Sequence, residues 1–281
     1  MKLAFCFLTY GDVDHREIWA QFFAGASPDK YKIVVHSKTA TSTWLPGAIM
    51  APTVPTEWCQ FSLMEAQQSL FRTAALDPDV TKFILLSGDS IPLYRFDALY
   101  RKLTADNKGY IRKVEKPQSD KMKPNLAAWP KGKPFNWSLS SQWVIFNRRH
   151  VTMLDEHFPM LRSVFGTMYI PDEHMYIIFF EGFGELSSFN MTPPVYVQWD
   201  RPSPILGKIL ASMLKIEKRH LGNRPCSEKH RKRPHTFHAE EFTKGAIAGF
   251  YKSGALFLRK TCRLAEFKVD FSREELLCAS A

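Results

Sequence analysis

The first hundred residues alternate between continuous apolar runs and segments whose apolar residues recur at helical spacing. The runs at 2–10, 31–37 and 81–90 end in small or polar residues and predict buried strands. Segments 15–25 and 62–76 carry an apolar stripe and predict helices. This alternation, with short connections, predicts an α/β fold: a mainly parallel, Rossmann-like sheet flanked by helices. Its ligand should lie beyond the carboxyl ends of the strands.

The amino-acid composition changes after residue 103. Segment 104–140 is rich in Lys and Pro and predicts an irregular surface loop. Beyond it, 140–151 predicts a strand running into a helix, 194–200 a short strand, and 253–262 a closing strand. We therefore expect one domain over 1–281, in which the irregular segment 104–140 separates 1–103 from 141–281.

Composition narrows the class of protein. The 281 residues are 45% hydrophobic, enough for a sizeable core, but no apolar run approaches the roughly 20 residues that a bilayer requires. The five cysteines form no C-x-x-C pair and predict free thiols in a reducing compartment. With the initiating methionine, this favours a cytoplasmic protein, microbial or viral, without a membrane segment; a removed membrane anchor is the alternative. The net charge of +10 indicates an anionic partner.

Several motifs follow one another in an order that identifies a family. They are "AFCFLTYGDV", residues 57–76, "FILLSGDSIPLYRF", "SSQWVIFNRRHV", "PDEH", "VQWDR", "RPHTF" and "LFLRK". In this order they resemble the core-2/I-branching β-1,6-N-acetylglucosaminyltransferase family, which includes the peptide O-xylosyltransferases and a plant branch. The resemblance implies a GT-A-like fold, an inverting mechanism and a UDP-sugar co-substrate. It also implies that 1–103 is the nucleotide-binding half and 141–281 the acceptor and phosphate-binding half. It implies no cofactor and no divalent metal.

The "PDEH" stretch supplies the candidate general base. Inverting transfer needs a group that takes the proton of the acceptor hydroxyl as its oxygen attacks the anomeric carbon, and a carboxylate suits this task. By resemblance Glu173 is that base. On the motif alone, the better interpretation is that Pro171 and the two acids begin the following helix. Both interpretations can hold together.

The leaving diphosphate needs positive charge, from a metal on carboxylates or from fixed cations. Asp77 and Asp79 form a D-x-D motif, but it precedes a strand, the wrong end for a ligand, and predicts a solvated turn. Asp89, at the correct end, is a single carboxylate. Arg259 and Lys260 end an apolar strand, and by resemblance they hold the donor phosphates. An ordinary surface pair is the alternative interpretation.

The remaining expected site residues rest on the resemblance and on their place at strand ends. The donor set is Thr9, His36, Ser37, Thr56, Glu57, Trp58, Ser87, Asp89, Arg233, Arg259 and Lys260. The acceptor set is Ser141, Gln142, Trp143, Asp172, Trp199 and Asp200. An indole offers a flat surface to a pyranose, although Trp143 could equally be core.

The sequence leaves three questions open. The donor sugar is xylose or N-acetylglucosamine, because Glu57 stands where xylosyltransferase relatives tend to carry Arg and Gln142 where they carry Asp. A metal-dependent transferase using Asp89 is the first alternative. The second is a polyanion- or nucleic-acid-binding protein built on the basic run 215–238, which we disfavour because that run has few aromatic residues for base stacking. We expect a UDP-sugar and a glycan or glycoprotein acceptor as partners, and no nucleic acid.

Overall fold

The structure, a computed structural model, describes residues 1–115, 122–198 and 234–279. Its main sheet has the strand order β3-β2-β1-β4-β7-β6-β8. These strands are β1 (Lys2–Thr9), β2 (Tyr31–Ser37), β3 (Ile49–Met50), β4 (Val80–Ser87), β6 (Gly109–Tyr110), β7 (Ile145–Asn147) and β8 (Phe189–Asn190). The first four strands in this order are parallel to one another. β7 runs antiparallel to β4 and β6, and β8 is parallel to β6.

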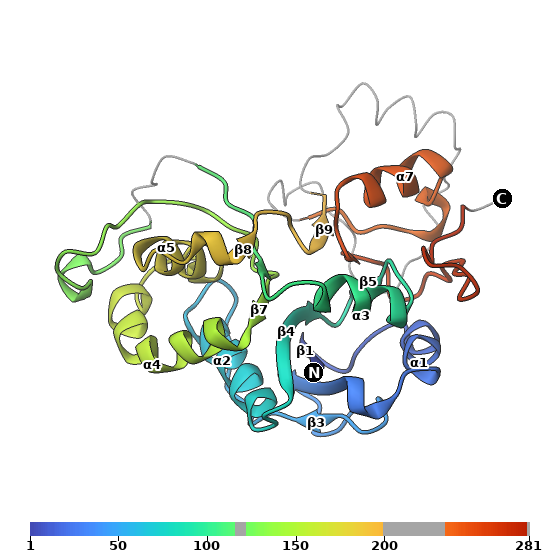
Figure 1. Cartoon of the computed structure of the whole chain (residues 1–281), viewed down its shortest axis with the longest axis horizontal. Coiled ribbons are helices and arrows are strands. Elements are labelled where there is room, and N and C mark those ends of the chain that lie inside the picture. Colours follow the sequence, from blue (N-terminus) through green and yellow to red (C-terminus); the bar gives the residue numbers. More distant parts are fainter. Residues whose placement is uncertain (116–121, 199–233, 280–281) are drawn as a thin grey trace.

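Helices cover both faces of this sheet, and Figure 1 shows α1 and α2 on opposite sides of β1 and β4. The α-helices are α1 (Arg16–Ala24), α2 (Ser62–Ala75), α3 (Phe96–Thr104), α4 (Arg148–Phe165), α5 (Met175–Gly182) and α7 (Lys244–Lys252). Short 3-10 turns are η1 (Pro28–Lys30), η2 (Leu126–Ala128), η3 (Pro171–Glu173), η4 (Leu186–Ser188) and η5 (Ala239–Glu241). α2 and α4 pack against each other and against the strands on one face. The expected fold class, a mainly parallel sheet flanked by helices, is confirmed.

The apolar spacing of α2 explains its position. Met64 lies seven residues before Phe71, Leu70 and Phe71 lie four and three residues before Ala74, and all four are fully buried. They therefore form one stripe that faces the sheet. On the opposite face of the sheet, the ring of Phe5 from β1 packs edge-to-face against the rings of Phe22 and Phe23 from α1.

A second, three-stranded sheet carries the C-terminal part of the chain. It contains β5 (Ile91–Pro92), β10 (Phe257–Arg259) and β9 (Val195–Val197), with β10 in the middle. Trp19 of α1 joins the two sheets, because its ring lies against Phe7 of β1 and Phe257 of β10, and its Nε1 donates to Ser90 O at 3.0 Å. This packing brings the end of β10 beside the carboxyl end of β4.

The segment 104–140 is more integrated than its composition predicts. Most of its described residues are irregular, but Gly109–Tyr110 form β6 inside the main sheet, and Ile111 and Trp129 are buried. The predicted strands at 194–200 and 253–262 are present as β9 and β10. Among the described residues, no helix is both long and apolar enough to cross a membrane. The described cysteines Cys6, Cys59, Cys262 and Cys278 are free thiols, as expected.

Candidate active site

Thr9 and Ser37, from the expected donor set, lie side by side at the carboxyl ends of β1 and β2. The Ser37 hydroxyl donates to Gly11 O at 2.7 Å, and the Thr9 hydroxyl donates to the same carbonyl and reaches His36 O at 3.3 Å. Thr9 and Ser37 are both buried. Their side chains therefore shape the loop after β1, and the loop backbone forms the rim of the site.

His36 holds the next loop in place. Its Nε2 accepts a hydrogen bond from Val54 N at 2.9 Å, so the ring is neutral, and burial lowers its pKa. Two residues further on, Thr56 is buried and its carbonyl accepts from Lys38 Nζ at 2.6 Å. Glu57 and Trp58 are exposed, and 73% of Trp58 is open to solvent. Trp58 is thus accessible to a ligand, whereas His36 and Thr56 support the loop from beneath.

Arg259, at the end of β10, meets the turn after β4. Its Nε donates to Ser87 Oγ at 2.9 Å and lies 3.4 Å from Asp89 Oδ1, and Ser87 Oγ also bonds to Asp89 and, at 2.8 Å, to Ser90 Oγ. Both charged side chains are largely buried, with 16% and 17% exposure. The guanidinium is therefore fixed in orientation. Lys260, next in the chain, is half-buried.

His15 and Thr261 extend this cluster, and sequence reasoning missed both. The Thr261 hydroxyl donates to Asp89 O at 2.6 Å, so it must accept from His15, whose Nε2 lies 2.7 Å away. His15 therefore carries its proton on Nε2, and burial lowers its pKa to about 4. His15 also has a left-handed backbone, with φ 54°. The polar residues that follow β1 were the only signal for it in the sequence.

Trp143 supports Arg259 from the acceptor side. The guanidinium carbon lies 4.5 Å from the centroid of the indole ring, a cation–π contact. Trp143 is 5% exposed, so it is largely core, and the face that it presents is covered by Arg259. Ser141 and Gln142, just before it, are half-buried. The two interpretations of Trp143 thus combine: a buried ring that holds a site cation.

Glu173 lies at the other end of the same segment. Ser140 N donates to Glu173 O at 2.7 Å, which joins the 140–143 segment to the η3 turn. Glu173 is half-buried at the end of η3, and α5 begins at Met175. Residues 140–143 therefore contact the candidate base at one end and the candidate phosphate cation at the other.

Asp172 differs sharply from its neighbour. It is 8% exposed, its Oδ1 has no hydrogen-bond partner among the described residues, and burial raises its pKa to about 6. His174, also buried, stacks on Trp137 and its Nδ1 donates to Ser138 O at 2.8 Å. The "PDEH" stretch thus has a buried acid, a half-buried acid and an anchored imidazole in succession.

Two left-handed residues meet beside this stretch. Cys59 (φ 65°) and Ile170 (φ 57°) are joined by a 3.0 Å hydrogen bond from Ile170 N to Cys59 O. A branched residue in this conformation costs roughly 1–2 kcal/mol, so the surrounding structure must hold it. This contact places the Glu57–Trp58 loop next to η3, and so links the two expected halves of the site.

Asp14 is a further carboxylate at the nucleotide edge that sequence reasoning missed. It is half-buried, Asp14 N donates to Gly88 O at 2.9 Å, and burial together with the nearby charge of Asp89 raises its pKa to about 6. Among the described residues, no group of three or more His, Cys, Asp and Glu side chains could hold a metal ion. Asp14 and Asp89 are thus two carboxylates in electrostatic contact, with Arg259 beside the second.

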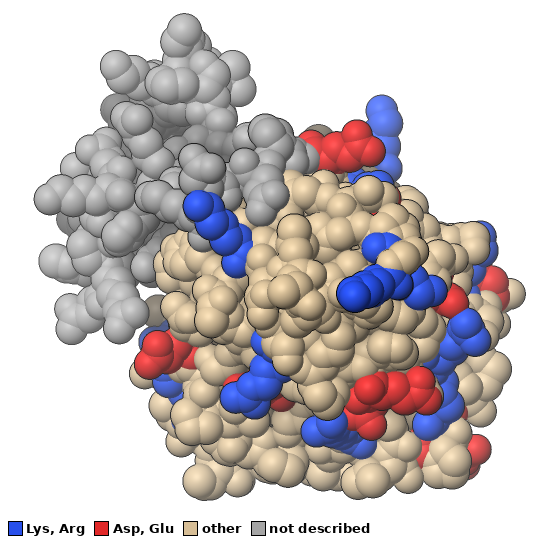
Figure 2. Space-filling model, turned by 90° about the vertical axis from the view of Figure 1, so that its left-hand side faces the viewer, with Lys and Arg blue, Asp and Glu red and all other residues tan. Residues whose placement is uncertain are grey.

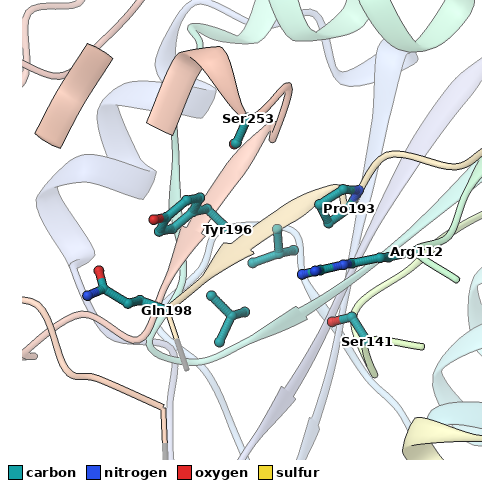
Figure 3. Close-up of a pocket in the computed structure, with 8 residues that line it drawn as sticks. Arg112, Ser141, Pro193, Tyr196, Gln198 and Ser253 are labelled. Atoms are coloured by element: carbon teal, nitrogen blue, oxygen red, sulfur yellow. The ribbon is translucent and has the colours of Figure 1, made fainter. Parts of the chain in front are cut away.

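A cavity of about 410 Å³ adjoins Ser141 (Figure 3). β9 forms its floor with Val195 and Val197, and Val197 pairs in register with Arg259 of β10. The other described lining residues are Arg112, Pro193, Tyr196, Gln198 and Ser253. This volume falls in the range of small-ligand sites, which is on the order of 300–1,000 Å³. Ser141, from the expected acceptor set, connects this cavity with the candidate site.

Three expected site residues, Arg233, Trp199 and Asp200, lie outside the described part of the chain, as does most of the basic run 215–238. Asp77 lies before β4, at the end of the sheet away from the site, as expected. The motif lies in a turn, as expected, in which Asp79 is exposed and Asp77 is half-buried. Lys2 Nζ bonds the Asp77 carboxylate at 2.9 Å, and that hydrogen bond lowers the pKa of Asp77.

The order of the strands and the grouping of polar residues at the sheet's carboxyl edge define an α/β protein with a candidate site at that edge. The sequence model of the Core-2/I-Branching enzyme family matches residues 3–247, and the chain belongs to that family. It is also 24% identical over 211 residues to Glycosyltransferase BC10 of Oryza sativa subsp. japonica, which covers 72% of this chain and 48% of the rice protein. The chain therefore spans about half the length of this relative.

Proposed function

We propose that this protein is an inverting, metal-independent glycosyltransferase. It moves xylose or N-acetylglucosamine from a UDP-sugar to a hydroxyl of a glycan acceptor and forms a β-linkage. Membership of the Core-2/I-Branching enzyme family supports this class of activity, as does the printed name of the rice relative. The observation that carries the proposal is the 140–143 segment, which touches Glu173 through Ser140 N and Arg259 through the Trp143 ring.

The proposed chemistry is a single displacement. The Glu173 carboxylate takes the proton of the acceptor hydroxyl while that oxygen forms a bond to the anomeric carbon of the donor. The bond between that carbon and the β-phosphate oxygen breaks, and UDP leaves with the electron pair. Since attack comes from the face opposite UDP, the base and the phosphate cations must lie on opposite sides of the sugar. The 140–143 segment supports this assignment, because the backbone of Glu173 lies at one end of it and Arg259 at the other.

Arg259 and Lys260 would balance the charge that develops on UDP. A guanidinium that is already oriented, with its Nε bound to Ser87 and its plane on Trp143, loses little further freedom when phosphate binds. The Asp89 carboxylate beside it partly neutralises the cation in the absence of substrate. When UDP binds, its phosphates compete with Asp89 for the guanidinium. Arg259 would then provide the positive charge that a metal ion provides in metal-dependent transferases.

The first test is calorimetric titration of the purified protein with UDP, UDP-xylose, UDP-N-acetylglucosamine, UDP-glucose and UDP-galactose, in chelator and then with Mn²⁺. Binding of one UDP-sugar in chelator supports the proposal and names the donor. Absence of binding to every nucleotide in both conditions would overturn it.

The second test addresses the base. Glu173→Gln should abolish transfer and leave the affinity for UDP unchanged, because the amide has nearly the same shape but cannot accept the proton. Glu240→Gln, an exposed carboxylate of η5, is the matched control and should behave as the wild type. Turnover retained in Glu173→Gln would rule out the assignment of Glu173.

A metal-dependent transferase is the second candidate, and the proximity of Asp14 and Asp89 favours it. The pKa of Asp14 is raised by burial and by the charge of Asp89. A cation bound between the two carboxylates would offset their mutual repulsion. If UDP binds only with Mn²⁺, and Asp14→Asn abolishes this Mn²⁺-dependent binding, this candidate replaces the first.

A further inference from the structure

The cavity beside Ser141 carries one cation that the proposed reaction does not use. Arg112 is the only charged residue among the described residues that line it, and Figure 3 shows its side chain reaching over the β9 floor between Pro193 and Ser141. Arg112 makes no hydrogen bond or ion pair with any residue of the described part of the chain. A guanidinium in this position has donors to offer to a ligand.

The backbone on both sides of Arg112 is fixed. Ile111 is buried and its N donates to Asn190 O at 3.1 Å, and Val114 exchanges two backbone hydrogen bonds with Leu139, at 2.7 and 2.9 Å. The neighbouring cation, Lys113, points elsewhere, since it binds Glu181 at 2.7 Å and lies 3.9 Å from Glu115. Glu115 and Glu181 are thus paired with Lys113, and Arg112 has no counterion from them.

We propose that this cavity binds an acidic sugar of the acceptor, with Arg112 contacting its carboxylate. Arginine matches a carboxylate in a planar, two-bond geometry, and the remaining lining offers hydroxyl, amide and aromatic groups that suit a pyranose. The proposal rests on the proposed glycosyltransferase function, since it names the acceptor class of that same site. The net charge of +10 favours an anionic acceptor in the same sense.

The donor diphosphate is the other anion that Arg112 could meet, and the placement disfavours it. Arg112 follows β6 and faces β9 and Ser141, on the acceptor side of the 140–143 segment. None of the described residues that line the cavity is Arg259 or belongs to the loops after β1, β2 and β4, although Val197 of its floor pairs with Arg259. The cavity therefore continues the acceptor wall.

The test compares matched pairs of methyl glycosides: β-glucuronide with β-glucoside, and β-galacturonide with β-galactoside. Binding to the UDP-loaded protein is measured by ligand-observed NMR titration. The wild type should bind at least one uronide roughly tenfold more tightly than its neutral partner, and Arg112→Gln should remove that preference. Arg112→Lys should keep only part of it, because a single ammonium cannot form the two-bond contact.

Arg273→Gln, an exposed arginine that does not line the cavity, is the matched control and should keep the preference. Arg112 is itself exposed, so its replacement should not affect folding, which the thermal midpoint checks. The proposal is overturned if no uronide is preferred by the wild type, or if the preference survives in Arg112→Gln. It is also overturned if Arg112→Gln weakens UDP binding and the wild type prefers the uronide only before UDP is added, since the anion bound by Arg112 would then be the diphosphate. Failure of UDP itself to bind would instead count against the proposed function.

Discussion

Arg259 lies with its guanidinium carbon 4.5 Å from the centre of the Trp143 ring, while its Nε donates to Ser87. The ring supports one face of the cation, and the Ser87–Asp89 pair fixes its edge. Only the other nitrogens of the guanidinium are then available to a ligand. A diphosphate that binds there meets a cation whose direction is set before it arrives.

Replacement of Trp143 tests this relationship. Trp143→Leu should weaken UDP binding roughly tenfold, because Arg259 loses its supporting face and must be ordered by the ligand. Trp143→Phe keeps an aromatic face and should retain most of the affinity. Calorimetric titration with UDP measures both variants, with the thermal midpoint as a check that each is folded. Wild-type affinity in Trp143→Leu would show that the stacking does not serve UDP binding.

Asp172 should make the protein less stable as the pH rises through the range from about 4 to 6. Its pKa is raised from 3.8 to about 6 by burial, so the folded state holds the proton more tightly than the unfolded state between these values. The free energy of unfolding therefore falls over this interval and stays lower above it, by up to about 3 kcal/mol. Asp172→Asn resembles the protonated acid and should be more stable than the wild type at pH 8.

Denaturant unfolding at pH 4, 6 and 8 measures the effect. Asp14→Asn is the comparison, because Asp14 also has its pKa raised to about 6 but is only half-buried, so solvent screening should make its contribution smaller. Parallel stability profiles for the wild type and Asp172→Asn would mean that the carboxylate is better solvated than its burial indicates.

His15 should act on the site through Thr261 while remaining neutral. Because burial lowers its pKa to about 4, its ring NMR signals should not shift between pH 5.5 and 8. His15→Asn keeps a residue that tolerates the left-handed backbone but removes the 2.7 Å contact with Thr261. UDP affinity should fall roughly three- to tenfold, as expected for one lost hydrogen bond. Thr261→Val should give a similar loss, and the double variant should lose little more.

The sequence predicted the elements whose pattern is long and regular. β1, β2 and β4 are nearly continuous apolar runs, and α2 has a complete apolar stripe, so period and length were sufficient to identify them. The grouping of Ser87, Asp89 and Arg259 followed from strand ends together with the family resemblance. The positions of strand ends alone could not show that Arg259 Nε donates a hydrogen bond to Ser87 Oγ.

The remaining features depend on contacts between residues far apart in the chain. His15 and Thr261 are 246 positions apart, and no local pattern in the sequence connects them. Arg112 lies in the Lys- and Pro-rich segment 104–140, where its residue type does not distinguish it from the other basic residues. β6 has two residues, too few for any period to be visible. These features arise from how β10, β8 and α1 pack, which composition and spacing do not encode.

Gly109 offers a test of that packing, since it holds β6 between β7 and β8. A methyl group at this position would lie 2.7 Å from Ile145 O and 2.7 Å from a ring carbon of Phe189. One of these contacts is a strand carbonyl that cannot move without breaking the sheet. Gly109→Ala should therefore lower the free energy of unfolding by about 1–3 kcal/mol.

Because Ile111 and Arg112 follow β6 directly, the same substitution should also disturb the cavity. Uronide binding should weaken in Gly109→Ala, whereas UDP binding at the opposite end of the 140–143 segment should change less. Gly245→Ala is the matched control: it lies in the first turn of α7 with nothing within 4 Å of the added methyl, and helix propensity makes it neutral or slightly stabilising. If Gly109→Ala were as stable as this control, β6 would not be packed as tightly between its neighbours as the distances require.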